Sequence, residues 1–174
     1  MKKLPNHTAL KEWSNVIESI GRGEQVILIR KGGIADPTFG VDAPQFYLYP
    51  TYFHQGETDA RPFVTITHWC EVARNWEIRD LELVYRLGPL VSIPKETLDA
   101  RYRFRPNQAL HVIGIRAFEL AKPQSIAFRE SYIGCRSWIS VDDEIDISDS
   151  RPVLSDRDLA KKLDEVDLLI TAAV

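Results

Sequence analysis

Short, mostly apolar segments of strand length follow one another along this chain, and their order constrains the fold more than any other feature. Strands are predicted over residues 25–30, 46–49, 62–68, 101–105, 109–120 and 130–141. Residues 78–87 fit a strand or a helix, and a strand is favoured because Ile78, Val84 and Tyr85 are good strand formers. A doubly wound parallel sheet needs strands that alternate with helices, and this chain lacks that alternation. The sequence therefore predicts an α+β fold, with a curled, mostly antiparallel sheet or small barrel and an N-terminal, a short middle and a C-terminal helix.

The N-terminal helix is predicted from a stripe of apolar residues. These residues recur at helical spacing: Leu10, Trp13, Val16, Ile17 and Ile20. Asn6 or Thr8 is the expected N-cap, and Gly21 and Gly23 are expected to end the helix. The continuous apolar run at residues 25–30 then predicts a central strand that is covered on both faces or curls into a barrel.

The other two helices are predicted from their starts. The middle one begins at an early proline and covers residues 94–100. In the last one, Ser155 and Asp158 have the spacing of a capping box. Its apolar face consists of Leu159, Leu163, Val166 and Ile170. We expect one domain over residues 1–174, with a core at about 7–141, an acidic loop at 142–150 and the final helix at about 155–171.

Composition excludes several classes of protein. The net charge of -3 is not that of a polycation, although local basic stripes can still bind nucleic acid. No apolar run approaches the roughly 20 residues of a membrane span, and the first residues lack the apolar region of a signal peptide. Cys70 and Cys135 are too few for a disulfide framework and suit a reducing compartment. We therefore expect a cytoplasmic protein without a membrane partner.

The candidate site lies where two predicted strands end. The first strand runs into Arg30, Lys31, Gly32 and Gly33, which place two cations beside a backbone that a ligand can approach closely. The second strand runs into polar side chains that can orient such a ligand: Thr51, Tyr52, His54 and Gln55. Together these residues predict a phosphate-binding cleft. The alternative is a pair of solvated strand ends, with His54 hydrogen-bonded to a loop carbonyl.

A second group of candidate residues follows Gly134. Cys135, Arg136 and Trp138 offer a thiol, a fork of donors and a stacking face. A structural turn or a binding role is favoured over a nucleophilic thiol, because adjacent residues of a strand point to opposite faces and Arg136 could not activate Cys135.

Alternating arginines form a third group. Arg101, Arg103 and Arg105 would present three guanidinium groups on one face of a strand, which suits phosphate contacts. An edge strand with solvated arginines explains the same pattern.

Four strings of this sequence resemble the uncharacterised prokaryotic family called domain of unknown function 1802: ALKEW, ILIRKGGI, FYLYPTYFHQ and YIGCRSWISV. That resemblance implies no known activity. The order of Gly23 to Arg30, SIPKETLDARY and ALHVIGIRAFELAKP is similar to that of ASCH and other PUA-like domains. This second resemblance implies a small β-barrel, and many such domains bind RNA or modified nucleosides. Catalytic ASCH members have Lys and Thr just after the glycine, where this chain has Glu24, Gln25 and Val26, so a binding role is favoured over amidohydrolase chemistry.

The favoured hypothesis is a non-catalytic module that binds RNA, DNA or a nucleotide and needs no cofactor. One alternative is a Mg²⁺-dependent nuclease with Lys31 as its cation, and another is a protein–protein scaffold. The nuclease would draw its carboxylates from Glu18, Asp36, Asp42, Asp80 and Glu82. Zinc is not expected, because no metal-ligand spacing links the histidines and cysteines. The sequence does not specify an oligomeric state.

Overall fold

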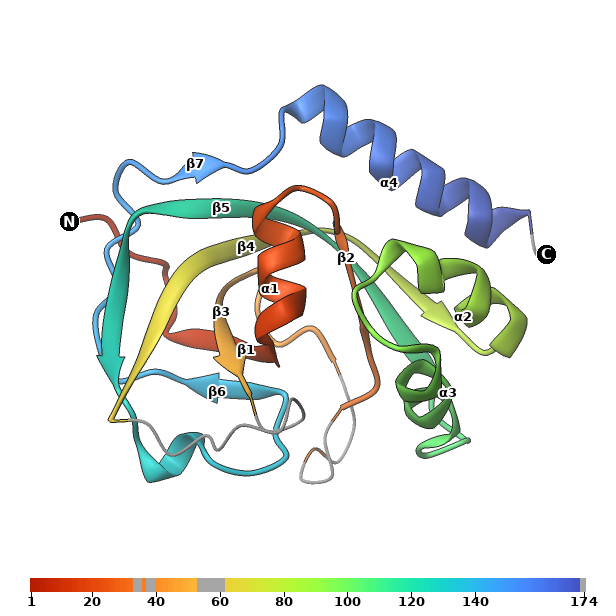
Figure 1. The fold of residues 1–174 in the computed structure, drawn as a ribbon, viewed down its shortest axis with the longest axis horizontal. Helices are drawn as coiled ribbons and strands as arrows, with labels where there is room; N and C mark the ends of the chain where they lie inside the picture. Colours follow the sequence, from red (N-terminus) through yellow and green to blue (C-terminus); the bar gives the residue numbers. More distant parts are fainter. Residues whose placement is uncertain (33–35, 37–39, 53–61, 173–174) are drawn as a thin grey trace.

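A computed structural model describes residues 1–32, 36, 40–52 and 62–172. In these residues seven strands form one sheet, in the order β2-β5-β4-β3-β1-β6, with β7 paired to β5 (Figure 1). The strands are β1 (Thr8–Trp13), β2 (Ile27–Arg30), β3 (Gln45–Thr51), β4 (Phe63–Ile78), β5 (Leu110–Ala127), β6 (Trp138–Ser140) and β7 (Arg151–Pro152). The helices are α1 (Ser14–Gly21), α2 (Leu81–Leu87), α3 (Lys95–Arg103) and α4 (Asp156–Thr171), with short 3-10 turns at Gly88–Leu90 and Glu130–Tyr132. No helix in the described part of the chain is long and apolar enough to cross a membrane.

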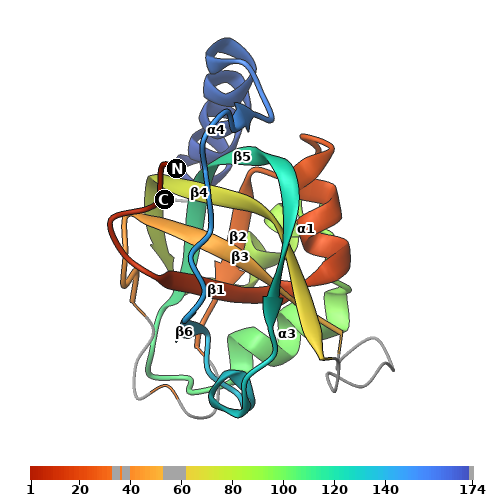
Figure 2. The same cartoon turned by 90° about the vertical axis from the view of Figure 1, so that its left-hand side faces the viewer.

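The sheet curls because its two longest strands bend together. β4 and β5 form an antiparallel ribbon whose register shifts between Ile66 and His68 and again between Val72 and Arg74. Such irregularities bend a strand and increase its twist. The ribbon therefore folds over, and the shorter strands wrap round with it (Figure 2). All strand pairs are antiparallel except β1 with β3, which run parallel. The predicted α+β class with a curled, mostly antiparallel sheet is confirmed.

Apolar residues cover both faces of the curled sheet. One core cluster joins β2 and β5 to all four helices, and the other lies across β3, β4 and the segment before and after β6. Ile27, Leu28 and Ile29 of β2 are each at most 1% exposed, so the prediction that this strand is covered on both faces is confirmed. Its predicted central place in the sheet was wrong, since β2 is the first strand of the hydrogen-bonded order and helices cover it.

The final helix is the element that its sequence predicts best. Ser155 caps α4, and its hydroxyl accepts a hydrogen bond from the backbone N–H of Asp158 at 3.1 Å. The buried face of α4 packs against β5 at Gly114, where an added Cβ would lie 2.8 Å from Leu163 Cδ2 and 3.1 Å from the Trp76 ring. Glycine at this position therefore sets how closely α4 approaches the sheet.

Four secondary-structure predictions were wrong. Residues 8–13 form β1, which pairs with β3, so the first helix begins only at Ser14, although it ends at Gly21 as predicted. Residues 81–87 form helix α2, because the Asp80 side chain accepts from the Glu82 N–H at 2.9 Å and caps it. The predicted strand at 101–105 is mostly the end of α3, and only residues 138–140 of the predicted strand 130–141 are extended in the sheet.

Candidate functional site

Charged side chains bridge the gap in the curled sheet between β1 and β2, which we call the open seam. β2 is the first strand of the hydrogen-bonded order and β1 is the fifth, yet Arg30 Nη1 on β2 lies 3.1 Å from Glu12 Oε2 on β1. Arg101 on α3 enters the same gap. Its Nη1 donates to the Ile29 carbonyl oxygen at 2.8 Å, and its Nη2 lies 3.9 Å from Glu12 Oε1. Side chains rather than a strand ladder thus connect β1 and β2 across this gap.

The open seam carries more positive than negative charge. The side chains of Glu12, Arg30 and Arg101 are 0%, 12% and 18% exposed, so two guanidinium groups share one carboxylate largely out of water. Burial lowers the pKa of Arg101 from an ordinary 12.5 to about 10, Glu12 opposes this shift and Arg30 adds to it. The Arg101 guanidinium also lies 5.5 Å from the centroid of the Trp13 ring. The site holds Arg101 as a cation that its single carboxylate does not fully compensate.

Two of the predicted site residues meet at the open seam. Arg30 contacts the Glu12 side chain, and the Thr51 hydroxyl at the end of β3 donates to the Glu12 carbonyl oxygen at 3.2 Å. The strands that carry Arg30 and Thr51 are not neighbours in the sheet, because β5 and β4 lie between β2 and β3. The curl of the sheet brings these two strand ends together.

Lys31 and Gly32 follow Arg30 but do not extend the seam outward. Lys31 is 4% exposed, and its ammonium group donates to the Tyr102 carbonyl oxygen. Burial, with the nearby charge of Arg79, lowers the pKa of Lys31. Gly32 has φ +89°, which favours glycine, and it turns the chain after β2. Three other predicted site residues, Gly33, His54 and Gln55, lie outside the described residues.

A second recess, the aromatic hollow, lies on the other face of β1 and β3. It has a volume of about 320 Å³, including the space open to solvent, and is lined by Lys11, Tyr49, Pro50, Tyr52, Val64, Phe128, Tyr132 and Ile133. The Lys11 ammonium donates to the carbonyl oxygens of Tyr132 and Gly134, each at 2.8 Å. Of the predicted site residues, Tyr52 lies in this hollow.

The predicted group after Gly134 is only partly exposed. Cys135 and Arg136 are exposed on the surface just beyond the carbonyl that Lys11 contacts. Trp138 is half-buried, with its indole N–H on the Gly40 carbonyl oxygen at 2.9 Å and its ring edge-on to Phe46 at 5.1 Å. The Trp138 ring therefore packs against the core.

A family model matches most of the chain. The model described as domain of unknown function (DUF1802) matches residues 9–165. This chain belongs to the DUF1802 family. The match includes β1, β2 and α3, and so every strand and helix of the open seam. No curated protein matches this DUF1802 chain.

Solved structures similar to this DUF1802 protein are ASCH proteins. A serine-to-alanine variant of an ASCH protein from Zymomonas mobilis superposes with a TM-score of 0.51 at 11% identity, over 95% of this chain and 99% of that chain. A tyrosine-to-phenylalanine variant from the same organism gives a TM-score of 0.49 at 11% identity, over 91% and 96% of the two chains. The first superposition shows that the DUF1802 chain has the fold of an ASCH domain.

Residues 24–26, where this DUF1802 protein departs from catalytic ASCH members, have structural contacts. Glu24 forms a surface ion pair with Arg22 at 3.0 Å. Gln25 is buried, and its side chain donates to the Ile27 carbonyl oxygen and accepts from the Ser92 N–H, both at 2.8 Å. Gln25 thereby joins the start of β2 to the loop before α3.

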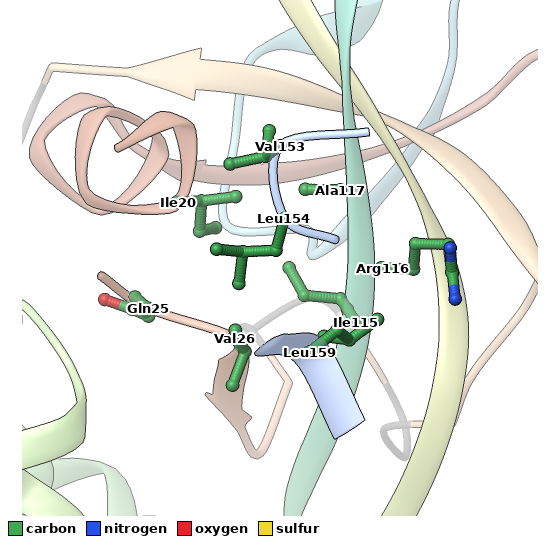
Figure 3. A pocket seen from close by; sticks show the side chains of 9 residues that line it. All are labelled: Ile20, Gln25, Val26, Ile115, Arg116, Ala117, Val153, Leu154 and Leu159. Carbon is green, nitrogen blue, oxygen red and sulfur yellow. The ribbon is translucent and has the colours of Figure 1, made fainter. Parts of the chain in front are cut away.

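A further cavity lies between α1, β5 and the segment that leads into α4 (Figure 3). Its lining is mostly apolar, with Ile20, Val26, Ile115, Leu154 and Leu159 around it. The polar groups at its border are already bound: Gln25 is held as described, and Arg116 forms an ion pair with Asp156. Nothing in this lining is left to recognise a polar ligand.

The carboxylates of the nuclease hypothesis do not come together. In the described part of the chain no three His, Cys, Asp or Glu side chains lie close enough to hold a metal ion. Asp80 caps α2, and Asp36 accepts from the Ser137 N–H at 2.9 Å. Burial, with Asp36 nearby, raises the pKa of Asp42, so these two acids lie near each other. The nuclease hypothesis therefore gains no support from this structure.

Sequence reasoning missed Glu12, Trp13 and Arg101 as seam residues. The predicted N-terminal helix includes Glu12 outside its apolar stripe, whereas in β1 Glu12 shares a face with the buried Leu10. A strand interpretation of TALKEW would have shown a glutamate on an apolar face, and such a residue needs a cationic partner. Arg101 was identified as a candidate phosphate contact, but on a strand rather than on α3.

Proposed function

We propose that this protein binds nucleic acid or a nucleotide and that the open seam holds a phosphate group between Arg30 and Arg101. The observation that carries the proposal is the ratio of charges, with two guanidinium groups and one carboxylate in a mostly buried setting. An unbalanced buried cation is unfavourable until an anion joins it. A phosphate oxygen would supply that anion, and it would raise the pKa of Arg101 towards its ordinary value.

The type of cation favours phosphate as the anion. Arginine offers a planar fork that binds phosphate through two parallel hydrogen bonds. Within the described residues, the Arg30 side chain donates from Nη1 to Glu12, which leaves the donors on Nε and Nη2 for a ligand. Two further cations lie beside α3: the Tyr102 hydroxyl of that helix donates to the Arg79 carbonyl oxygen, and Arg105 follows the end of the helix. They would draw a polyanion to the open seam through a long-range field.

Nucleic acid is favoured over other phosphates by the fold. Many ASCH and PUA-like domains bind RNA or modified nucleosides, and this chain shares their architecture. Aromatic side chains lie on the opposite face of the same two strands, in the aromatic hollow. A positively charged groove combined with aromatic side chains is how many proteins bind single-stranded nucleic acid.

The proposal is tested by fluorescence anisotropy with a labelled single-stranded RNA, repeated with DNA of the same length, over a series of salt concentrations. We expect Arg30→Gln and Arg101→Gln each to weaken binding about tenfold or more. Each should also reduce the slope of log affinity against log salt by about 0.7, the value for one lost contact to a single-strand phosphate.

The matched control is Arg103→Gln, because Arg103 lies on the same helix as Arg101 but is exposed and paired with Asp99. Arg101→Lys keeps the charge without the fork and should bind with intermediate affinity. Thermal unfolding of each variant establishes that it is folded at the assay temperature. Wild-type affinity in both glutamine variants, or no binding of RNA, DNA or nucleotides at low salt, contradicts the proposal.

A further inference from the structure

The charged groups of the open seam have a defined net charge. In the described part of the chain, Glu12 of β1, Arg30 of β2 and Arg101 of α3 meet across the gap. Apart from burial, the charges that shift the pKa of Arg101 are those of Glu12 and Arg30. Lys31, the next residue after Arg30, is turned to the Tyr102 carbonyl oxygen instead. Two guanidinium groups and one carboxylate therefore leave the seam with one surplus positive charge.

The phosphate groups of nucleic acids differ in charge according to how they are esterified. An internal phosphodiester carries one negative charge. A terminal phosphate monoester carries about -1.5 to -2 charges at pH 7, because its second pKa is about 6. A surplus charge of either sign is unfavourable in a mostly buried setting, since water compensates it poorly there. One phosphodiester balances the open seam, whereas a doubly charged monoester would leave it with a surplus negative charge.

The donors of Arg30 fit the same type of ester. Nη1 of Arg30 donates to Glu12 Oε2 at 3.1 Å, which leaves Nε and Nη2 within the described residues. These two nitrogens lie on one edge of the planar guanidinium group and offer two parallel N–H donors. A phosphodiester has two oxygens that are not esterified, so each donor can bind one of them. Arg101 contributes mainly its charge, because its Nη1 already donates to the Ile29 carbonyl oxygen.

We propose that the open seam selects an internal phosphodiester of a nucleic-acid strand over a terminal phosphate monoester or a free nucleotide, and that Glu12 sets this selectivity by limiting the net charge. The inference rests on the proposed function and names the class of phosphate for that same site. Arg30 is the contact residue, and Glu12 is a positioning residue that acts through the two arginines. A basic surface open to water would show the opposite preference, since Coulomb attraction there grows with the charge of the anion.

Two small anions test the selectivity, dimethyl phosphate as the diester and methyl phosphate as the monoester. Each competes with a labelled single-stranded RNA in fluorescence anisotropy at pH 8 and constant ionic strength. We expect dimethyl phosphate to displace the RNA at about a tenfold lower concentration than methyl phosphate. At pH 5 methyl phosphate has one charge, and the two anions should then compete about equally. Dimethyl phosphate keeps its charge over this range, so its own curve reports any titration of the protein.

Glu12→Gln should reverse the order of the two anions. The substitution removes the carboxylate and leaves two surplus positive charges, so methyl phosphate should become the better competitor at pH 8. The matched control is Glu18→Gln, which removes a carboxylate from an exposed position of α1 and should keep the order of wild type. Thermal unfolding with and without each anion establishes that the variants are folded and gives a second measure of affinity.

The wild-type comparison decides the inference without requiring any variant to fold. If methyl phosphate competes as well as dimethyl phosphate at pH 8, the selectivity is wrong, and the proposed function stands if Arg30→Gln still weakens RNA binding. An unchanged order in folded Glu12→Gln protein overturns the role of Glu12. If no RNA, DNA or nucleotide binds and neither anion raises the unfolding temperature, the inference and the proposed function are both wrong.

Discussion

The open seam and the attachment of α4 both pair arginine with carboxylate side chains, but in opposite ratios. In the seam, two arginines share one glutamate whose side chain is fully buried. At the attachment of α4, which we call the α4 clamp, Arg74 lies between Asp164 and Asp167, and the Trp76 indole N–H donates to Asp167 at 2.8 Å. The three charged side chains of the α4 clamp are between 34% and 65% exposed, so water screens their surplus negative charge.

This difference is the reason why we propose the open seam, and not the α4 clamp, as the ligand site. Water screens the surplus charge of the α4 clamp, and the pairing there joins α4 to β4. The surplus charge of the open seam is mostly shielded from water, so an anion that binds there would stabilise it more than water does. We therefore expect substitutions in the open seam to have larger effects on stability and binding than substitutions in the α4 clamp.

The largest effect is expected for Glu12→Gln. This substitution leaves two buried guanidinium groups facing each other without a carboxylate, and we expect the free energy of unfolding to fall by about 3 kcal/mol or more. Urea denaturation measures the loss, and added sulphate or phosphate should restore part of it. Glu18→Gln, at a glutamate on the exposed side of α1, should stay within about 0.5 kcal/mol of wild type. A loss below about 1 kcal/mol for Glu12→Gln would mean that the Glu12 carboxylate interacts only weakly with Arg30 and Arg101.

A smaller effect is expected where α4 meets the sheet. Gly114→Ala places a methyl group 2.8 Å from Leu163 Cδ2 and 3.1 Å from the Trp76 ring, and we expect a loss of about 1–3 kcal/mol from overpacking. Leu163→Ala in the same chain should make room for the methyl group, so the double variant should lose less than the sum of the two single losses. If the two losses of stability simply add in this double-mutant cycle, residues 114 and 163 are not in contact.

Lys31→Met tests a charge that lies beside the seam but points inward. Because burial lowers the pKa of Lys31, the unfolded chain holds this proton more tightly, and stability should rise with pH as the folded form loses it below the ordinary value of 10.5. The variant should lack that alkaline rise and stay within about 1 kcal/mol of wild type at pH 7. RNA affinity should change less than in Arg30→Gln. An equal loss of affinity would place Lys31 in direct contact with the ligand.

The smallest effect is expected in the α4 clamp. Asp164→Asn removes one of the two carboxylates around Arg74 at an exposed position, and the urea midpoint should shift no more than for an ordinary surface substitution. Salt should abolish whatever difference remains, because exposed pairs are screened. A loss comparable to that of Glu12→Gln would erase the distinction between the two regions.

The sequence predicts the fold class and parts of the site because those depend on local patterns. The Ser155 cap and the apolar run of β2 are local signals, and both led to correct elements. Residues 9–13 of the predicted N-terminal helix pair instead with β3, more than 35 positions away, and this long-range pairing overrides their helical spacing. Asp80 was a local signal that was overlooked, since an N-cap aspartate precedes α2.

The site could be predicted only in part, because some of its residues are brought together by long-range packing rather than by local sequence. Arg30 and Thr51 lie at strand ends, which the sequence indicates, and the structure brings both to Glu12. Arg101 reaches the seam only because α3 packs across it and the sheet curls. Neither the packing of α3 nor the curl follows from the residues around Arg101.

Arg101 has a second consequence, for the behaviour of the protein at high concentration. Among the described residues β2 is the first strand of the sheet, and its unpaired edge becomes a template on which another chain can add when the helices that cover it open. The Arg101 guanidinium occupies the Ile29 carbonyl oxygen on that edge, so the same side chain that we assign to phosphate also blocks strand addition. Variants that shorten Arg101 should therefore self-associate more readily than variants that shorten Arg30.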